Sequence, residues 1–422
     1  MSAPVPTTGH AEGRELRRNL VCHVLEGGLY IGGLSFVHAN TVLPRALEQL
    51  GASPWLVALA PVLLGIGFIS PGLFVAHRIE QLSAMRGWVV QLGVWQRLPY
   101  LLAGLALLWA TRYPALALPA VLLSPLISGL IGGVAVNAWK EYVASAIPER
   151  LRASMWATRY VLGTVLGLGA GGVVSQVLAR EPGPRGYAYL HLGTFVFLAL
   201  SFVIFLGTSE KPRHSRPPQQ SFAEFVRGVP ALVASDRRFQ LYLWARIPVH
   251  AAYILVPFLG IHALRVLGKP DAYLGSLLTF NMLGSLVGFA LAGYSGDRHG
   301  GKLSLLLAHG GWLAVAALTP LARESYQFQA LFAVLGASLS LSAVGLSTLD
   351  LEITPLDRRV SFQAILGAFT LLGLVGSSLL SAFIRELTRN IWALCAPTLL
   401  MTLVSLGLFL KIEEPRRSSR AP

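Results

Sequence analysis

Cysteine and charge are both scarce in this chain. Its 422 residues include 2 cysteines, and 13% are charged, whereas 54% are hydrophobic and the mean hydropathy is +0.60. The cysteines, Cys22 and Cys395, lie in apolar segments, which gives no support to a disulfide framework or a thiolate metal site. A composition so poor in charge excludes an ordinary soluble domain and predicts a protein embedded in lipid.

Motifs for catalysis and nucleotide binding are also lacking. The sequence contains no phosphate-binding loop, no triad spacing and no carboxylate cluster suited to a metal. His191, His250 and His309 are scattered without metal-ligand spacing. We therefore expect neither an enzyme nor an ATP-driven pump, and neither a metal nor a cofactor.

The charge that is present is basic, with 34 Lys and Arg against 20 Asp and Glu and a net charge of +14. These residues lie mostly in loops between apolar runs, which indicates a membrane-orientation signal and no nucleic-acid partner. The first apolar run carries Glu26 and lacks a small-residue cleavage site, which favours a retained first helix over a removable secretory signal.

Long apolar runs fill most of the sequence. Twelve are long enough to cross a bilayer, arranged as six, a hydrophilic gap and six. They predict an all-α membrane protein with a tail at 1–18, a six-helix bundle at 19–207, a linker at 208–238, a second six-helix bundle at 239–410 and a tail at 411–422. The linker is expected to hold a short amphipathic helix at 221–234. The predicted spans are 19–38, 55–75, 88–110, 115–138, 156–179, 189–207, 239–261, 272–294, 303–322, 327–349, 362–384 and 391–410.

The distribution of Lys and Arg predicts how the chain is threaded. With twelve spans, both termini and the even-numbered connections share one side, which carries 22 Lys and Arg against 9 on the other, with 3 inside helices. Because the basic excess marks the cytoplasmic side, we expect both termini and the linker in the cytoplasm. Arginine exceeds lysine, which is typical of a GC-rich bacterial genome and favours a bacterial cytoplasmic membrane.

The two halves share short stretches in the same order, which predicts two pseudo-symmetric bundles. The matches are Arg17-Arg18 with Arg237-Arg238, Leu50-Gly51 with Leu267-Gly268, and Pro148, Arg152, Ser154 and Ala157 with Pro355, Arg359, Ser361 and Ala364.

A compact charged loop follows the eighth predicted helix and reads Gly293-x-x-x-Asp297-Arg298-x-Gly300-x-Lys302. It resembles the cytoplasmic signature of the major facilitator superfamily, whose members are secondary transporters with twelve membrane helices. The resemblance implies that this loop latches helix 8 to helix 11 when the protein faces outward. The first-half copy has Ala76 where the aspartate belongs, so no latch is expected there. The stretches Leu50-Gly-Ala-Ser and Ile147-Pro-Glu-Arg resemble uncharacterised bacterial permeases of the superfamily, which have no agreed substrate.

Four ionisable residues fall inside predicted helices, where charge is costly and usually functional. They are Glu26, Arg97, Arg159 and Arg246. Glu26 and Arg246 each lie eight residues after the matched arginine pair. Our hypothesis is that they form an ion pair or share a substrate across the pseudo-two-fold axis, with Glu26 taking up a proton when the pair opens. A structural salt bridge, or side chains reaching the cytoplasmic surface, is the alternative.

Other polar residues extend this candidate site. Arg97, with Gln96 beside it, offers a positive charge to an anionic substrate or a counter-ion to a carboxylate. Arg159, near a helix end, is expected to reach the surface or to cap the preceding loop. His250 follows Arg246 by four residues and is expected on the same helix face. Asn137 and Asn281 provide cavity contacts or, as the favoured role, hydrogen bonds between helices.

Glycines form a stripe along the fifth predicted helix at Gly163, Gly167 and Gly171, and small residues of this kind let helices pack closely. The sequence as a whole predicts a monomeric alternating-access carrier of a small organic solute, coupled to protons. A membrane sensor or assembly factor without flux and an exporter of lipids or hydrophobic drugs remain the alternatives.

Overall fold

The computed structural model describes residues 8–71, 74–75, 84–210, 233, 237–354 and 359–413, and the regular elements within them are all helical. Ten helical stretches are long and apolar enough to cross a membrane. The other two predicted spans correspond to the short pair α3 (Pro54–Leu59) and α4 (Leu63–Ile69) and to α6 (Arg86–Leu108). Each predicted span therefore has a helical counterpart.

The helices of the two halves follow in chain order. The first half continues with α1 (Thr8–Leu34), η1 (Ser35–Val37), α2 (Val42–Gln49), α7 (Pro114–Ala146), α8 (Glu149–Arg180) and α9 (Pro184–Leu206). The second half holds α11 (Arg237–Arg246), η2 (Pro248–His250), α12 (Ala252–Leu267), α13 (Tyr273–His299), α14 (Gly301–Leu318), η3 (Thr319–Leu321), α15 (Ser325–Ile353), α16 (Arg359–Leu387) and α17 (Trp392–Lys411). The predicted helix at 221–234, most of the linker and most of the first-half copy of the signature lie outside the described residues.

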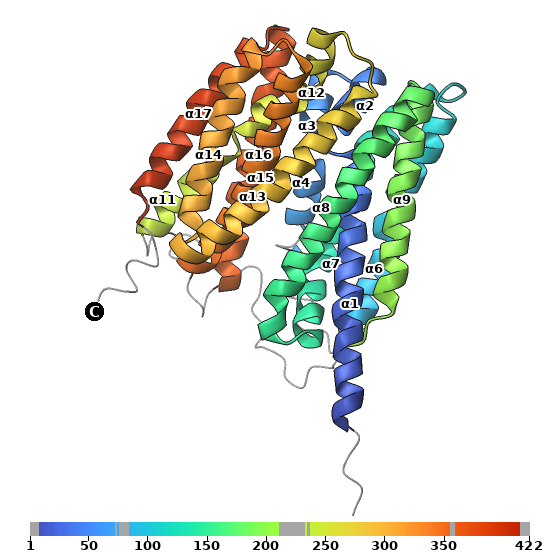
Figure 1. Ribbon diagram of the computed structural model, residues 1–422, viewed down its shortest axis with the longest axis vertical. Helices are drawn as coiled ribbons and strands as arrows, with labels where there is room; N and C mark the ends of the chain where they lie inside the picture. The colour runs from blue at the N-terminus through green and yellow to red at the C-terminus, as the bar shows by residue number, and fades with distance from the viewer. Residues whose placement is uncertain are drawn as a thin grey trace, which may run out of the picture.

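The two halves form two helical bundles that lie side by side (Figure 1). The first runs from blue to green and the second from yellow to red. Helix α1 begins and α17 ends at the same end of the molecule, which we call the terminal end, and we call the opposite end the distal end. The bundles approach each other at the distal end and diverge toward the terminal end (Figure 1).

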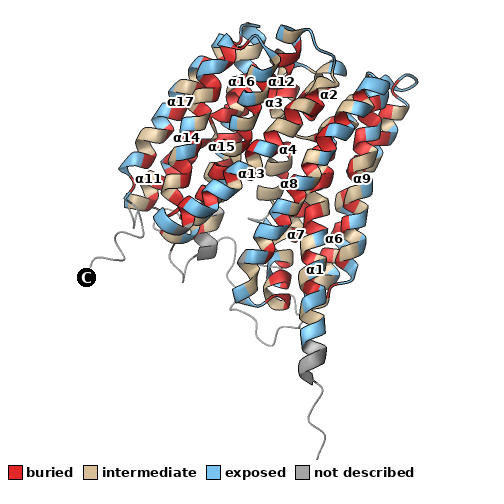
Figure 2. Ribbon diagram, viewed as in Figure 1, coloured by how far each residue is buried: buried red, intermediate tan, exposed pale blue. Residues whose placement is uncertain are grey.

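Large apolar side chains coat the outer faces of both bundles. Leu102 is 61% exposed and Leu400 is 64% exposed, and exposed residues follow the outward faces of the helices (Figure 2). In water, so much apolar surface would drive aggregation, whereas in hydrocarbon it costs nothing. Together with the ten long apolar helices, this surface identifies a multi-pass membrane protein.

The first span of each half is interrupted. In the first half, η1 and a turn separate α1 from α2, and in the second half η2 separates α11 from α12. Pro248 begins η2, and because proline has no N–H it cannot continue the helical hydrogen-bond ladder. The break falls between Arg246 and His250, yet both side chains face α16: Arg246 bonds to Thr370, and a Cβ atom at Gly373 would lie 2.6 Å from His250 Cδ2.

Glycines on α8 let the two bundles touch backbone to backbone. A Cβ atom at Gly171 would lie 2.9 Å from the carbonyl oxygen of Gly275 on α13, and one at Gly275 would lie 2.3 Å from that of Gly171. Gly167 faces Met282 of α13, and Gly163 faces Ile31 of α1. The glycine stripe therefore packs α8 between its own bundle and the other bundle.

Polar side chains tie the bundles together at the distal end. Asp271, between α12 and α13, accepts hydrogen bonds from Arg45 Nε (2.8 Å), Tyr187 OH (2.6 Å) and Gln49 Nε2 (3.2 Å) of the first half. Glu48 of α2 pairs with Arg45 and with Arg265 of α12. We call these six residues the distal cluster: Arg45, Glu48, Gln49, Tyr187, Arg265 and Asp271.

Close packing of α13 against α15 gives a direct test of the fold. A Cβ atom at Gly284 would lie 1.8 Å from the carbonyl oxygen of Ala333, whereas one at Gly296, on the same helix, meets no atom within 4 Å. Gly284→Ala is expected to lower the free energy of unfolding by about 1–3 kcal/mol, because the helices must separate. Thermal melting of the purified variants measures this, with Gly296→Ala as the matched control. Equal melting temperatures would contradict the close contact.

Candidate functional site

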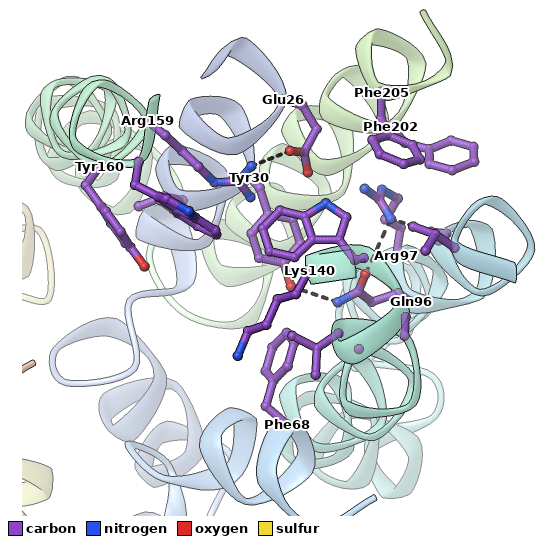
Figure 3. Close-up of a pocket in the computed structure, with 18 residues that line it drawn as sticks. Glu26, Tyr30, Phe68, Gln96, Arg97, Lys140, Arg159, Tyr160, Phe202 and Phe205 are labelled. Carbon is purple, nitrogen blue, oxygen red and sulfur yellow. Dashed lines mark hydrogen bonds and ion pairs between the residues drawn. The ribbon is translucent and has the colours of Figure 1, made fainter. Parts of the chain in front are cut away.

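A cavity of about 310 Å³ opens inside the first bundle. The residues that line it come from α1, α4, α6, α7, α8 and α9 (Figure 3). Val89, Lys140 and Trp156 lie near the ends of α6, α7 and α8 that face the terminal end, so the cavity occupies the terminal half of the bundle. The sequence predicted a cavity at the seam between the halves, whereas this one is lined by the first half alone.

Glu26 and Arg159 form a buried ion pair at the wall of this cavity (Figure 3). Arg159 Nη1 lies 2.5 Å from Glu26 Oε2, and their side chains are 8% and 7% exposed. The guanidinium also lies over the ring of Trp139, at 4.8 Å from its centre. Gly27 makes room for it, since a Cβ atom there would lie 1.9 Å from Arg159 Nε.

This geometry corrects two expectations. The predicted pair of Glu26 with Arg246 is wrong for this structure, because each residue has a partner within its own bundle. Arg159 neither reaches the surface nor caps the preceding loop. Helix α1 packs along α8, which places the Arg159 side chain against Glu26 instead.

Arg97 is buried on α6 without a carboxylate partner among the described residues. Its Nε donates to the carbonyl oxygen of Leu198 (2.7 Å) and its Nη1 to that of Gly93 (2.5 Å). The guanidinium lies 4.7 Å from the centre of the Phe202 ring. Backbone carbonyls and an aromatic face solvate this charge but do not neutralise it. The alternative was that Arg97 serves as a counter-ion to a carboxylate. No carboxylate among the described residues pairs with Arg97, so the structure does not support this alternative.

Gln96 and Lys140 add polar groups to the cavity wall. Gln96 Nε2 donates to the hydroxyl of Tyr30 at 3.0 Å, which joins α6 to α1. Lys140 lies on an exposed part of α7, lines the cavity and makes neither a hydrogen bond nor an ion pair with any described residue. Figure 3 shows the Glu26–Arg159 pair on one side of the cavity and Arg97 with Gln96 on the other.

The second bundle holds a buried ion pair of its own. Arg246 of α11 lies 3.2 Å from Asp350 of α15, and it donates to the Thr370 hydroxyl of α16 at 2.8 Å. The hydroxyl of Tyr242 donates to the same carboxylate at 2.6 Å. Arg246 therefore joins three helices of the second bundle and does not line the cavity of the first.

The remaining predicted site residues lie apart from the cavity. His250 is half-buried in η2, with its ring 6.2 Å from that of Tyr253. Asn281 of α13 donates to the carbonyl oxygen of Phe332 of α15 at 3.1 Å. This is the hydrogen bond between helices that the sequence predicted as its favoured role. Asn137 of α7 is half-buried and is not part of the cavity wall.

The charged signature loop joins α13 to α14 at the terminal end. Gly300 ends α13 with φ +85°, a left-handed conformation that glycine adopts without strain. Lys302 Nζ donates to the carbonyl oxygens of Leu410 and Ile412, so it holds the end of α17 and makes no bond to α16. Arg298 donates to the hydroxyl of Tyr294, while Gly293 is exposed and the Asp297 side chain lies outside the described structure. The latch between helices 8 and 11 stays a prediction.

Sequence reasoning missed the roles of Arg159, Lys140 and Asp350. Lys140 and Asp350 fell just outside predicted spans that ended at 138 and 349, whereas α7 continues to Ala146 and α15 to Ile353. A signal for Arg159 did exist, because Gly27 and Gly28 follow Glu26 and small residues on one helix admit a long side chain from its neighbour.

The architecture defines a class, a membrane transporter fold of two helical bundles, and solved structures agree. The chain superposes on a mutant form of the nucleoside transporter NupG with a TM-score of 0.70 and 13% identity, covering 93% of this chain and 98% of that one. The comparison with a D-xylose-proton symporter gives a TM-score of 0.66 at 16% identity, covering 95% of this chain and 99% of that one. The comparison with a bacterial homologue of the iron transporter ferroportin in an inward-facing state gives a TM-score of 0.62 at 15% identity, covering 94% and 98% of the two chains.

Sequence comparison adds the family. Residues 249–422 match the sequence profile described as Major Facilitator Superfamily, whereas no curated protein matches the chain. The second half of the chain thus matches the major facilitator superfamily, and the whole chain has the fold of these solved transporters.

Proposed function

We propose that this protein is a proton-coupled carrier, with no enzymatic activity of its own, that moves a small organic solute across the bacterial cytoplasmic membrane by alternating access. The observation that carries the proposal is the buried Glu26–Arg159 pair on the wall of a 310 Å³ cavity. A carrier must expose its site to each side in turn, and the family achieves this by rocking two bundles. The protein works as a monomer, with bundles at 19–207 and 239–410 and both termini in the cytoplasm.

The ion pair supplies a mechanism for coupling. A carboxylate beside a guanidinium stays ionised, and loss of the guanidinium in a low-dielectric site favours uptake of a proton. The charged and titratable groups around Glu26 are Arg159 on α8, Arg97 on α6, Lys140 on α7, and His23 and Tyr30 on α1. Both residues lie in the first bundle, so rocking of the two bundles as rigid bodies would leave the pair intact. A shift of α8, which contacts α13 of the second bundle at Gly171, relative to α1 would separate the pair and so link protonation of Glu26 to the transport cycle.

The alternatives are less well supported by the cavity. The wall of the cavity is mainly apolar, as an exporter of lipids or hydrophobic drugs would require, but it also carries four charged side chains: Glu26, Arg97, Lys140 and Arg159. Such a substrate would leave Arg97 and Lys140 unpaired. A sensor would bind a ligand in the same cavity without moving it across the membrane, so uptake is the measurement that separates it from a carrier.

Reconstituted protein tests the proposal. A solute panel is first screened by thermal stabilisation, since a ligand at a hundred times its Kd adds about 2.7 kcal/mol to the free energy of unfolding. Stabilising solutes are then assayed for uptake into vesicles with an imposed pH gradient. We expect uptake that follows the gradient. Stabilisation without uptake of any solute would overturn the carrier in favour of the sensor.

A further inference from the structure

The first-bundle cavity is unevenly charged. Its wall carries one carboxylate, on Glu26, and three basic groups, on Arg97, Lys140 and Arg159. The carboxylate is already bound to Arg159 at 2.5 Å. Arg97 and Lys140 are left with no ion-pair partner in the part of the chain that the structure describes. Lys140 is exposed, but the charge of Arg97 is buried, and because an uncompensated buried charge is costly, an anion is the ligand that would gain most from this cavity.

Arg97 keeps hydrogen-bonding capacity for such a ligand. A guanidinium has five N–H donors, and its bonds to the carbonyl oxygens of Leu198 and Gly93 use Nε and Nη1. The Nη2 nitrogen donates to no described residue. It is not fully enclosed by protein atoms either, so a ligand can reach it. A planar guanidinium recognises carboxylate and phosphate groups, and of the two the carboxylate is the smaller and suits this cavity.

Aromatic rings form much of the remaining wall. Trp139 and Trp156 meet edge to face with ring centres 5.3 Å apart, and Trp156 stacks on Tyr160 at 6.1 Å. Phe68 and Phe202 line other parts of the cavity. Aromatic walls favour planar, apolar ligand bodies, and the hydroxyl of Tyr30 and the amide of Gln96 provide few hydrogen-bonding groups for a hydroxyl-rich solute.

The volume limits the size of the ligand. At about 310 Å³, the cavity lies at the lower end of the range for small-molecule sites, which suits a body of one or two rings. In the second bundle, by contrast, the buried Arg246 is already paired with Asp350.

From these observations we propose that the first-bundle cavity binds a small aromatic carboxylate, with its anionic group at Arg97 and its ring among Trp139, Trp156 and Tyr160. Lys140, on another part of the wall, adds to the positive charge of the cavity (Figure 3). This inference rests on the proposed carrier function and names its substrate class. The binding site then lies within one bundle, next to the Glu26–Arg159 pair and beside α13, whose Phe289 stacks on Tyr160 with ring centres 5.7 Å apart.

Equilibrium binding to the purified full-length protein tests the ligand class. Calorimetry compares benzoate and indole-3-acetate with their neutral amides, benzamide and indole-3-acetamide, and with cyclohexanecarboxylate. We expect each aromatic acid to bind at least tenfold more tightly than its amide, and benzoate more tightly than the saturated acid. Equal affinity for acids and amides would overturn the proposal, and equal affinity for benzoate and cyclohexanecarboxylate would overturn its aromatic part.

Variants assign the anion to its residues. Arg97→Gln is expected to weaken benzoate binding at least tenfold, Lys140→Gln to weaken it less, and Arg97→Lys to retain part of the affinity. Arg112→Gln is the matched control, because Arg112 is exposed between α6 and α7 and only contacts the Tyr113 ring. Should Arg97→Gln not fold, unchanged affinity in both Lys140→Gln and Arg97→Lys would still overturn the assignment.

These results are independent of flux, because no gradient is applied. Aromatic acids that bind but do not enter vesicles would contradict the carrier function and leave the ligand class standing. Uptake of a neutral solute with no binding of aromatic acids would contradict the ligand class and leave the carrier function standing.

Discussion

Glu26→Gln is expected to abolish the response of uptake to a pH gradient and to destabilise the protein. The substitution removes the proton-accepting carboxylate and leaves Arg159 in a buried site without its counter-ion. Removing one partner of a buried ion pair costs about 3–5 kcal/mol. Uptake measured at several imposed gradients, with thermal melting of the same preparations, gives both results. If uptake by the variant still responds to the pH gradient as the unmodified protein does, Glu26 does not couple transport to protons.

A second variant separates coupling from stability. Glu26→Gln combined with Arg159→Gln removes both charges, so melting is expected to return toward that of the unmodified protein while the pH response stays absent. Glu181→Gln is the matched control, because it breaks a pair with Arg185 whose side chains are 40% and 66% exposed. Exposed pairs contribute little, and this control is expected to change neither measurement. A double variant as unstable as Glu26→Gln would show that the loss does not come from the unpaired Arg159.

Asp271→Asn is expected to shift the protein toward the state that is open at its distal end. Asp271 accepts hydrogen bonds from Arg45, Gln49 and Tyr187 across the junction of the bundles. Charge-assisted hydrogen bonds contribute about 1.5–3 kcal/mol, so the ratio of the two states should change about tenfold to a hundredfold. If the termini are cytoplasmic, as proposed, the structure is open inward, and the variant should populate the outward-open state.

Distances between spin labels measure this shift. One pair on Arg180 and Lys269 reports the distal end, and another on Ser154 and His299 reports the terminal end, in a background with both cysteines replaced by serine. We expect the distal distance to lengthen while the terminal distance shortens. A longer distal distance alone would mean local loosening and would contradict a gate. Glu386→Gln, exposed near the distal end of α16, loses the same charge and should leave both distances unchanged.

The positions of the helices could be predicted from the sequence, because a bilayer imposes a length of apolar chain on each span. Most predicted ends lie within a few residues of the observed ones. The exceptions have polar partners that hydropathy cannot show. Helix α1 begins at Thr8, eleven residues before the predicted start, and its side chains Glu15 and Asn19 bond to Ser209. The interruption of the second span between α3 and α4 left no periodicity signal.

Several residues of the candidate site could be identified from the sequence, but the partners that they contact could not. Glu26, Arg97 and Gln96 were identified because polar side chains inside apolar helices are rare, and all three line the cavity. Their partners depend on which helices are neighbours. A single sequence shows how deep in the membrane a residue lies, but it does not show which neighbouring helix the residue contacts. The assumption of pairing across the two-fold axis therefore linked Glu26 to Arg246, while packing of α1 against α8 linked it to Arg159.

The contact of Gly171 with Gly275 also bears on how wide each entrance becomes. Gly171 lies 22 residues from the start of α8 and 9 from its end, which is about 33 Å and about 14 Å along the axis. If the bundles pivot there, one rotation displaces the near rim less than half as far as the opposite rim. The narrower mouth at the distal end would then limit the size of the molecules that pass through it, while the wider mouth at the terminal end would not.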